Sequence, residues 1–261
     1  MMLLSLRTCA RLIWRDLVVF KPTFFDRFLN ACIWVALTIV VFQYVFQDLG
    51  MQSDYGAFMA CANAINWGFF EVMENVARLI SDLQGEKSIS YDLTLPLPQW
   101  MVFSRIALAN AFQAMIVSLM ILPLSIVILR NDFPLEHVCL GKLLLIFVIS
   151  NLFYGFFSLW ITSLIPNLDS MNNIWMRLIF PLWWLGGYQF SWNTIHTISP
   201  FIAKCMLLNP ILYTCEGVRA AVFGQQGYLP FWVSFFALVF STVLVGYIGT
   251  RRMLKRLDCV Y

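Results

Sequence analysis

Long apolar stretches, each able to cross a lipid bilayer as a helix, recur along this chain of 261 residues. A helix needs about 20 apolar residues to cross roughly 30 Å of hydrocarbon. The stretches lack the period-2 alternation of a membrane barrel, and helices satisfy their own backbone polar groups inside a bilayer. We therefore expect an all-α, polytopic membrane protein, a single transmembrane domain over residues 1–261, with six spans at about 28–46, 55–80, 102–129, 138–164, 173–190 and 231–250.

The amino-acid composition supports this class. Hydrophobic residues make up 61% of the chain and charged residues only 12%, whereas an ordinary soluble domain is about 25% charged. The net charge of +3 is small and by itself says little. For a membrane protein of this kind we expect contact with membrane lipid and with no nucleic acid. No secretory signal is evident, because the first apolar stretch is rich in arginine and no small-residue cleavage site follows it.

Residues 3–20 form an amphipathic unit before the first span. Arg7, Arg11 and Arg15 recur every four residues and share one helical face, while leucine, isoleucine and alanine occupy another. This pattern is typical of a helix that lies in the membrane interface with its arginines toward the headgroups. We expect Lys21-Pro22 to end the helix. The alternative is a positively charged amphipathic N-terminus without a special role.

Two further segments are not expected to cross the bilayer. Residues 81–98 are the longest polar break in the first half of the chain and connect the second and third spans. Residues 191–230 hold two moderately apolar pieces, too short to span and interrupted by Pro200, Pro210 and Gly224. Such pieces indicate re-entrant or interfacial helices. We expect them on the outer side.

The distribution of basic residues predicts the orientation. Six spans put both termini on one side, and 13 of the 17 Lys and Arg then fall on that side. The positive-inside rule places both termini in the cytoplasm of a multi-pass protein of the inner membrane. The basic residues on the expected cytoplasmic side are Arg7, Arg11, Arg15, Lys21, Arg27, Arg78, Lys87, Arg105, Arg177, Arg251, Arg252, Lys255 and Arg256.

The chain carries no motif of soluble catalysis. His137 and His196 lie far apart, and neither HExxH, CxxC, GxSxG nor a GxxxxGK[ST] phosphate loop occurs. We expect no catalytic residue, metal or cofactor on this chain, so any nucleotide would bind to another chain. The seven cysteines show no paired spacing and are expected to be free thiols. A disulfide between Cys205 and Cys215 is the less favoured alternative.

Charged residues near membrane depth are the remaining candidates for function. Glu71 and Glu74 could couple transport to protons or ions, which would make the chain a secondary transporter. We favour an ion-paired helix end at the headgroups, because the second span is longer than the hydrocarbon is thick. For Glu216 and Arg219 we favour a structural ion pair over substrate contact. Asn63 and Asn66, one turn apart, are expected to make hydrogen bonds between helices rather than bind substrate.

The order of these parts resembles the permease subunit of ABC transporters of the type-2 exporter class. Four features carry the resemblance: the amphipathic helix with Arg15-Asp16 before the first span, Gly85-Glu86 leading to Leu95-Pro96-Leu97-Pro98, the non-spanning pieces after the fifth span, and Asn209-Pro210 followed by Glu216 and Arg219. Gly85-Glu86 departs from the family, which often has its acidic residue before the glycine. This departure concerns which residues of this segment dock on the ATPase and does not concern the family.

The resemblance implies a half-transporter that works with a second permease copy or a homologous permease and two cytoplasmic ABC ATPase subunits, where ATP binds. It implies that Gly85, Glu86, Pro96 and Pro98 belong to the ATPase-coupling segment. The implied function is export of an amphipathic substrate such as a drug, a lipid or a lipid-linked glycan. A wall of aromatic residues suits such a cargo and equally suits anchoring at the interface. A membrane-embedded enzyme and a purely structural subunit are weaker alternatives.

Overall fold

The computed structural model describes residues 2–46, 55–85, 88–95 and 97–258. These residues form helices and short turns, with no β-strand among them. Four helical stretches are long and apolar enough to cross a membrane: Leu6–Val45, Gln99–Leu129, Leu140–Leu164 and Phe231–Arg256. The expectation of an all-α membrane protein is therefore confirmed, and the count of six spans stays a prediction.

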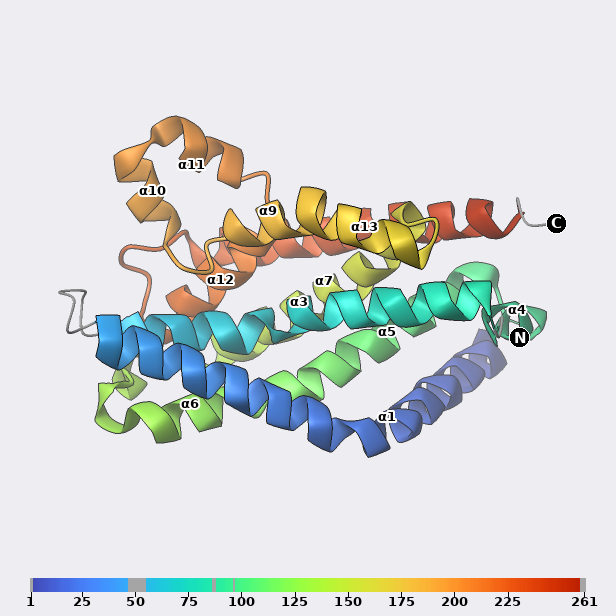
Figure 1. The fold of residues 1–261 in the computed structure, drawn as a ribbon, viewed down its shortest axis with the longest axis horizontal. Helices are drawn as coiled ribbons and strands as arrows, with labels where there is room; N and C mark the ends of the chain where they lie inside the picture. The colour runs from blue at the N-terminus through green and yellow to red at the C-terminus, as the bar shows by residue number, and fades with distance from the viewer. Residues whose placement is uncertain (1, 47–54, 86–87, 96, 259–261) are drawn as a thin grey trace.

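The principal helices run back and forth between two ends of the molecule (Figure 1). They are α1 (Met2–Val40), α3 (Tyr55–Gln84), α5 (Gln99–Ser118), α6 (Ile121–Leu129), α7 (Leu140–Leu164) and α13 (Phe231–Asp258). Helix α1 begins and α13 ends at the same end of the molecule, where the short helix α4 (Ser88–Thr94) also lies. We call this the α4 end.

Short helices occupy the opposite end. Helices α10 (Trp192–Ile198) and α11 (Pro200–Met206) project away from the bundle there, whereas α12 (Pro210–Val222) lies within the bundle (Figure 1). We call this the α10 end. Seven residues of helix span only about 11 Å, so α10 and α11 are each too short to cross a membrane. Helix α4 and the pair α10–α11 thus lie at opposite ends of the molecule.

The expectation that Lys21-Pro22 ends the first helix is wrong. Helix α1 continues through Pro22 to Val40 and passes into a π-helical turn, Val41–Val45. Proline lacks an N–H and its ring crowds the preceding turn, which bends a helix without necessarily ending it. Figure 1 shows α1 as two straight arms that meet at an angle. The amphipathic arm is therefore rigidly continuous with the first membrane-crossing arm.

Two other helices also differ from their expected bounds. Residues 102–129 form α5 and α6 with a break at 119–120, because Pro123 cannot donate to the carbonyl of Leu119.

The fifth apolar stretch is helical only from Met171 to Trp184, as α8 (Met171–Ile174), a π-helical turn (Trp175–Ile179) and α9 (Phe180–Trp184). Gly187 follows with a φ of 71°, a left-handed conformation that ends the helical run. At about 21 Å, this run is shorter than the hydrocarbon core.

Small residues allow the central helices to approach closely. A Cβ atom at Gly155 of α7 would lie 2.3 Å from the backbone oxygen of Ala107 on α5. On the other side, a Cβ atom at Gly249 of α13 would lie 3.1 Å from the backbone of Trp160 on α7. Close backbone approach favours association where lipid supplies no hydrophobic driving force between helices. Helix α7 is therefore held tightly between α5 and α13.

We predict that Gly155→Ala destabilises the protein, because the added methyl group forces α5 and α7 apart against backbone atoms. Gly141→Ala is the matched control on the same helix, since nothing lies within 4 Å of a Cβ atom there. The control should be neutral or stabilising by up to about 1 kcal/mol through helix propensity. Melting temperatures of the two variants in detergent test this, and equal values would contradict the close approach.

Candidate functional site

An arginine buried at the α4 end joins three helices. Arg105 of α5 is 3% exposed and donates one hydrogen bond to Asp16 of α1 and another to Asp92 of α4. Arg15 adds a hydrogen bond to Asp16, and its guanidinium nitrogen lies 3.6 Å from Asp92. Two guanidinium groups and two carboxylates thus balance each other, with Arg105 and Asp92 buried, Asp16 partly exposed and Arg15 half exposed. We call Arg15, Asp16, Asp92 and Arg105 the four-charge network.

Apolar side chains surround the four-charge network. Cys9 and Leu12, on the inner face of α1, contact a cluster formed by Leu97, Met101 and Val102. An ion pair in such surroundings contributes to stability only if its partners are well placed, since removing charges from water costs several kcal/mol per ion. The network therefore requires α1, α4 and α5 to keep one mutual arrangement. The N-terminal arm of α1 thus packs against α5 and is joined to α4 through Arg105.

Helix α4 is also fixed to the helix that precedes it. The carboxylate of Asp82, in the last turn of α3, accepts hydrogen bonds from the backbone N–H groups of Ser88 at 3.0 Å and Ile89 at 3.1 Å. A carboxylate in this position satisfies unpaired donors at a helix N-terminus and matches its positive dipole end. Helix α4 is thus attached to α3 through Asp82 and to α5 through Asp92.

One face of α4 is left for a partner. Ile89 and Asp92 are buried, whereas Ser88, Tyr91 and Thr94 are exposed at a spacing of three residues. The Tyr91 side chain is 67% exposed. Tyr91 was not among the residues expected from the sequence. The three-residue spacing of polar and buried side chains from 88 to 94 could have indicated it, once that stretch was recognised as a helix.

The four residues expected in the coupling segment have different surroundings. Gly85 is an exposed turn residue whose N–H bonds to the carbonyl of Ser81 at 2.9 Å. Pro98 is exposed and immediately precedes α5. Glu86 and Pro96 lie outside the described residues. Neither Gly85 nor Pro98 belongs to the four-charge network, so the buried part of this site was not among the expected residues.

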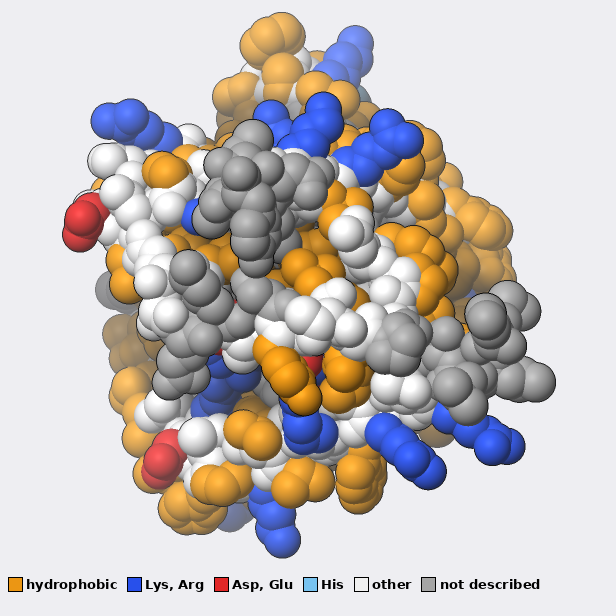
Figure 2. Space-filling model, turned by 90° about the vertical axis from the view of Figure 1, so that its right-hand side faces the viewer, with side chains coloured by type: hydrophobic (Ala, Val, Ile, Leu, Met, Phe, Trp, Pro, Cys, Tyr) orange, Lys and Arg blue, Asp and Glu red, His pale blue; other side chains and the backbone are white. Residues whose placement is uncertain are grey.

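Arginines distinguish the surface of the α4 end. Figure 2 looks onto this end and shows lysine and arginine side chains around it, with few aspartates or glutamates. Arg7 and Arg11 are exposed on α1, as are Arg251, Arg252 and Lys255 on the last turns of α13. Arg256 instead turns inward and donates to the backbone oxygens of Thr162, Ile165 and Pro166. These bonds satisfy carbonyl groups left unpaired at the C-terminus of α7.

Glu71 and Glu74 of α3 are ion-paired. Both carboxylates bind the guanidinium group of Arg27 on α1, and the indole N–H of Trp67 donates to Glu71 at 3.2 Å. The bound arginine neutralises much of the negative charge that a coupling ion would need. The interpretation as an ion-paired helix end is therefore supported, with Arg27 as the partner. Arg78 binds the side-chain oxygens of Asn75 and Asn110.

The expected ion pair between Glu216 and Arg219 is absent between these two described side chains. Glu216 instead accepts from the backbone N–H groups of Trp192 and Leu229, both at 2.9 Å. Burial raises the pKa of Glu216 above the ordinary glutamate value, and the field of Arg219 and these two hydrogen bonds oppose that rise. The reason for the difference is that both side chains find backbone partners in loops that sequence spacing cannot place.

Arg219 holds the turn that follows α9. Its side chain is fully buried and donates to the backbone oxygens of Gly187 at 2.6 Å and Tyr188 at 2.7 Å. Its guanidinium carbon lies 3.4 Å from the centre of the Phe58 ring on α3. Planar stacking and several fixed donors are the particular capacities of arginine. Pro210, by contrast, is the first residue of α12, where a missing N–H costs nothing.

Asn66 links helices, as expected. It accepts from the hydroxyl of Tyr154 on α7 at 2.7 Å and donates to the sulfur of Cys215 on α12 at 3.0 Å. Asn63 instead accepts from the hydroxyl of Tyr188, which lies in the turn after α9. The described cysteines are all free, with Cys215 buried and Cys205 exposed, so the disulfide is not formed.

We predict that Arg105→Leu lowers stability by about 3 kcal/mol, because two carboxylates lose their buried partner. Arg252→Leu is the matched control, since Arg252 is exposed and makes no interaction in the described structure. The readout is the melting temperature of each variant in detergent. Replacing Asp16 and Asp92 by asparagine in the Arg105→Leu background should recover part of the loss, and equal melting temperatures for the two single variants would contradict the network.

We predict that Arg219→Met releases the turn at 187–190, because backbone oxygens there lose charged donors worth about 1.5–3 kcal/mol each. Hydrogen exchange of this segment should increase. Lys204→Met is the control, since Lys204 is exposed on α11 and has no interaction in the described structure. Unchanged exchange at 187–190 in the Arg219 variant would show that the turn is held by other contacts.

The comparisons with known proteins agree with this architecture. A model of the ABC-2 type transporter family matches residues 7–223, which is more than half of the chain. A search of curated proteins finds no match. Permeases of this family generally work with an ABC ATPase and are themselves generally not catalytic. The chain belongs to the ABC-2 type transporter family and is the membrane-spanning permease component of an ABC-type transporter.

Proposed function

We propose that this permease exports an amphipathic substrate, such as a drug, a lipid or a lipid-linked glycan, and is driven by ATP bound on a separate ATPase. Two permeases, identical or homologous, would pair in the inner membrane above two ATPase subunits. The observation that carries the proposal is the four-charge network, which connects the exposed helix α4 to α1 and α5. A contact on α4 would therefore act directly on two helices that enter the bundle.

The proposed orientation follows from charge. Exposed arginines and lysines gather at the α4 end, which favours its placement in the cytoplasm. Both termini and α4 would then face the ATPase, and α10 and α11 would lie at the outer surface. Helices too short to span can shape an opening at the outer leaflet, because irregular backbone is tolerated at membrane depth where protein or water surrounds it.

The proposed mechanism is a change of population between two states. Closure of the ATPase pair would shift α4, whose Asp92 would carry Arg105 and α5 with it. Asp16 on the same guanidinium would tilt the N-terminal arm of α1, which is continuous with the first span through the bend at Pro22. ATP can favour one state of the permease only if the contact with the ATPase differs between the two states. This chain supplies the contact and the ATPase supplies the energy.

Ion-coupled secondary transport through Glu71 and Glu74 remains the alternative. The pairing of both carboxylates with Arg27 favours a structural role for them. Membership of the family favours transport driven by a partner ATPase. The alternative would be favoured if the purified chain used an ion gradient without any ATPase.

We predict that the tagged full-length chain, solubilised from its native membrane, co-purifies with an ATPase whose hydrolysis is inhibited by vanadate. Tyr91→Ala should weaken that association and reduce hydrolysis severalfold, because Tyr91 lies on the exposed face of α4. Tyr44→Ala is the matched control, a tyrosine that is 53% exposed in the π-helical turn at the α10 end.

Melting temperatures of the two variants should remain close to that of the unaltered protein. Equal loss of the ATPase from both variants, or no loss from either, would remove α4 as the docking element. Absence of any co-purifying ATPase under stabilising conditions would overturn the ATP-driven proposal itself.

A further inference from the structure

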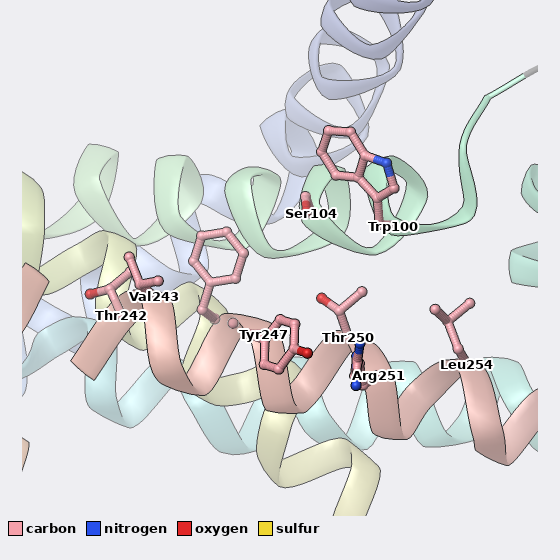
Figure 3. A pocket seen from close by; sticks show the side chains of 10 residues that line it. Trp100, Ser104, Thr242, Val243, Tyr247, Thr250, Arg251 and Leu254 are labelled. Carbon is pink, nitrogen blue, oxygen red and sulfur yellow. The ribbon is translucent and has the colours of Figure 1, made fainter. Parts of the chain in front are cut away.

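An apolar groove of about 530 Å³ lies between α5 and α13 at the α4 end. Figure 3 shows Trp100 of α5 on one side and Val243, Tyr247 and Thr250 of α13 on the other, with Thr250 directed toward the space between the helices. Phe156 of α7 also lines the groove. The groove lies beside the closely packed α7–α13 contact and belongs to none of the sites described above.

The groove is about as long as one membrane leaflet with part of its headgroup layer. Its α13 wall runs from Thr242 to Leu254, which corresponds to about 18 Å along a helix axis. Half of the hydrocarbon core is about 15 Å thick. Trp100 lies in the first turn of α5, and tryptophan is enriched at membrane–water interfaces. The groove therefore extends from the headgroup level to near the middle of the bilayer.

A positive charge lies at the headgroup end of this groove. Arg251 lies over the Tyr247 ring, with 4.6 Å from the guanidinium carbon to the ring centre, and has no carboxylate partner in the described part of the chain. Arg252 and Lys255 are exposed on the following turn. An arginine held on an aromatic face and free of a carboxylate is well suited to bind a phosphate group.

We propose that the groove binds one phospholipid of the leaflet at the α4 end, with its phosphate on Arg251 and one acyl chain between α5 and α13. The apolar wall fits the chain, and the arginine fits the phosphate at the depth where a bilayer places it. Arg251, Arg252 and Lys255 make this end of α13 basic, which favours an anionic headgroup over the same basic surface of a second copy. The inference needs only a membrane-spanning chain and does not depend on the transported substrate.

Native mass spectrometry of the delipidated full-length protein tests the proposal. Dioleoylphosphatidylglycerol is the probe, and dioleoylglycerol, which has the same chains without the phosphate, is the comparison. We expect one tightly bound phosphatidylglycerol, with Arg251→Gln raising its dissociation constant about tenfold. Arg252→Gln removes the same charge one residue away, outside the groove, and should bind as the unaltered protein does.

A second pair of variants tests the acyl-chain site. Thr250→Phe places a ring in the groove and should abolish the tight lipid, whereas Thr197→Phe makes the same change at an exposed position of α10 and should not. The proposal is overturned if the two arginine variants bind alike, or if dioleoylglycerol binds as tightly as phosphatidylglycerol. It is also overturned if Thr250→Phe leaves lipid bound but removes a permease dimer, since the groove would then be a protein interface. Should Thr250→Phe fail to fold, the arginine pair still decides.

Discussion

The burial of Arg105 is the constraint on which the α4 end of this permease depends. The guanidinium group of Arg105 is 3% exposed and is neutralised by two carboxylates, which come from α1 and from α4, on either side of α3 in the chain. Losing one partner of a buried ion pair costs more than the pair contributes. The three helices can therefore move together more easily than apart, which is the mechanical property that a connection to an ATPase requires.

The rest of the bundle follows a different principle. Between α5, α7 and α13, glycines bring backbones into direct contact, as at Gly155 and Gly249. Between α3, α7 and α12, buried side chains such as Asn66 and Tyr154 satisfy each other. In a bilayer both devices replace the hydrophobic effect, which does not distinguish a neighbouring helix from lipid. Helix α7 takes part in both and so forms the centre of the molecule.

The two ends differ in chemistry. At the α4 end, the buried charges of Arg105 and Asp92 bind each other, and many of the remaining arginines and lysines face solvent. At the α10 end, Glu216 and Arg219 bind backbone groups and hold the turn after α9 and the entry to α13. A permease that opens alternately to the two sides of the membrane needs a rigid contact with the ATPase at one end. At the other end it needs a separate, ordered group of helices. The phospholipid groove lies beside the first of these, on α5 and α13.

Much of this protein was readable from local pattern. Apolar runs of sufficient length predicted a helical membrane protein, the arginine stripe at 7, 11 and 15 predicted an amphipathic helix, and the order of motifs predicted the family. These features depend on neighbours within one or two turns, which sequence displays directly. The tertiary structure decided the partners. Asp16 and Arg105 are separated by 89 positions, and Arg27 and Glu71 by 44, so no spacing rule could pair them. For the same reason Glu216 and Arg219, neighbours on one helix, proved to bind distant backbone instead of each other.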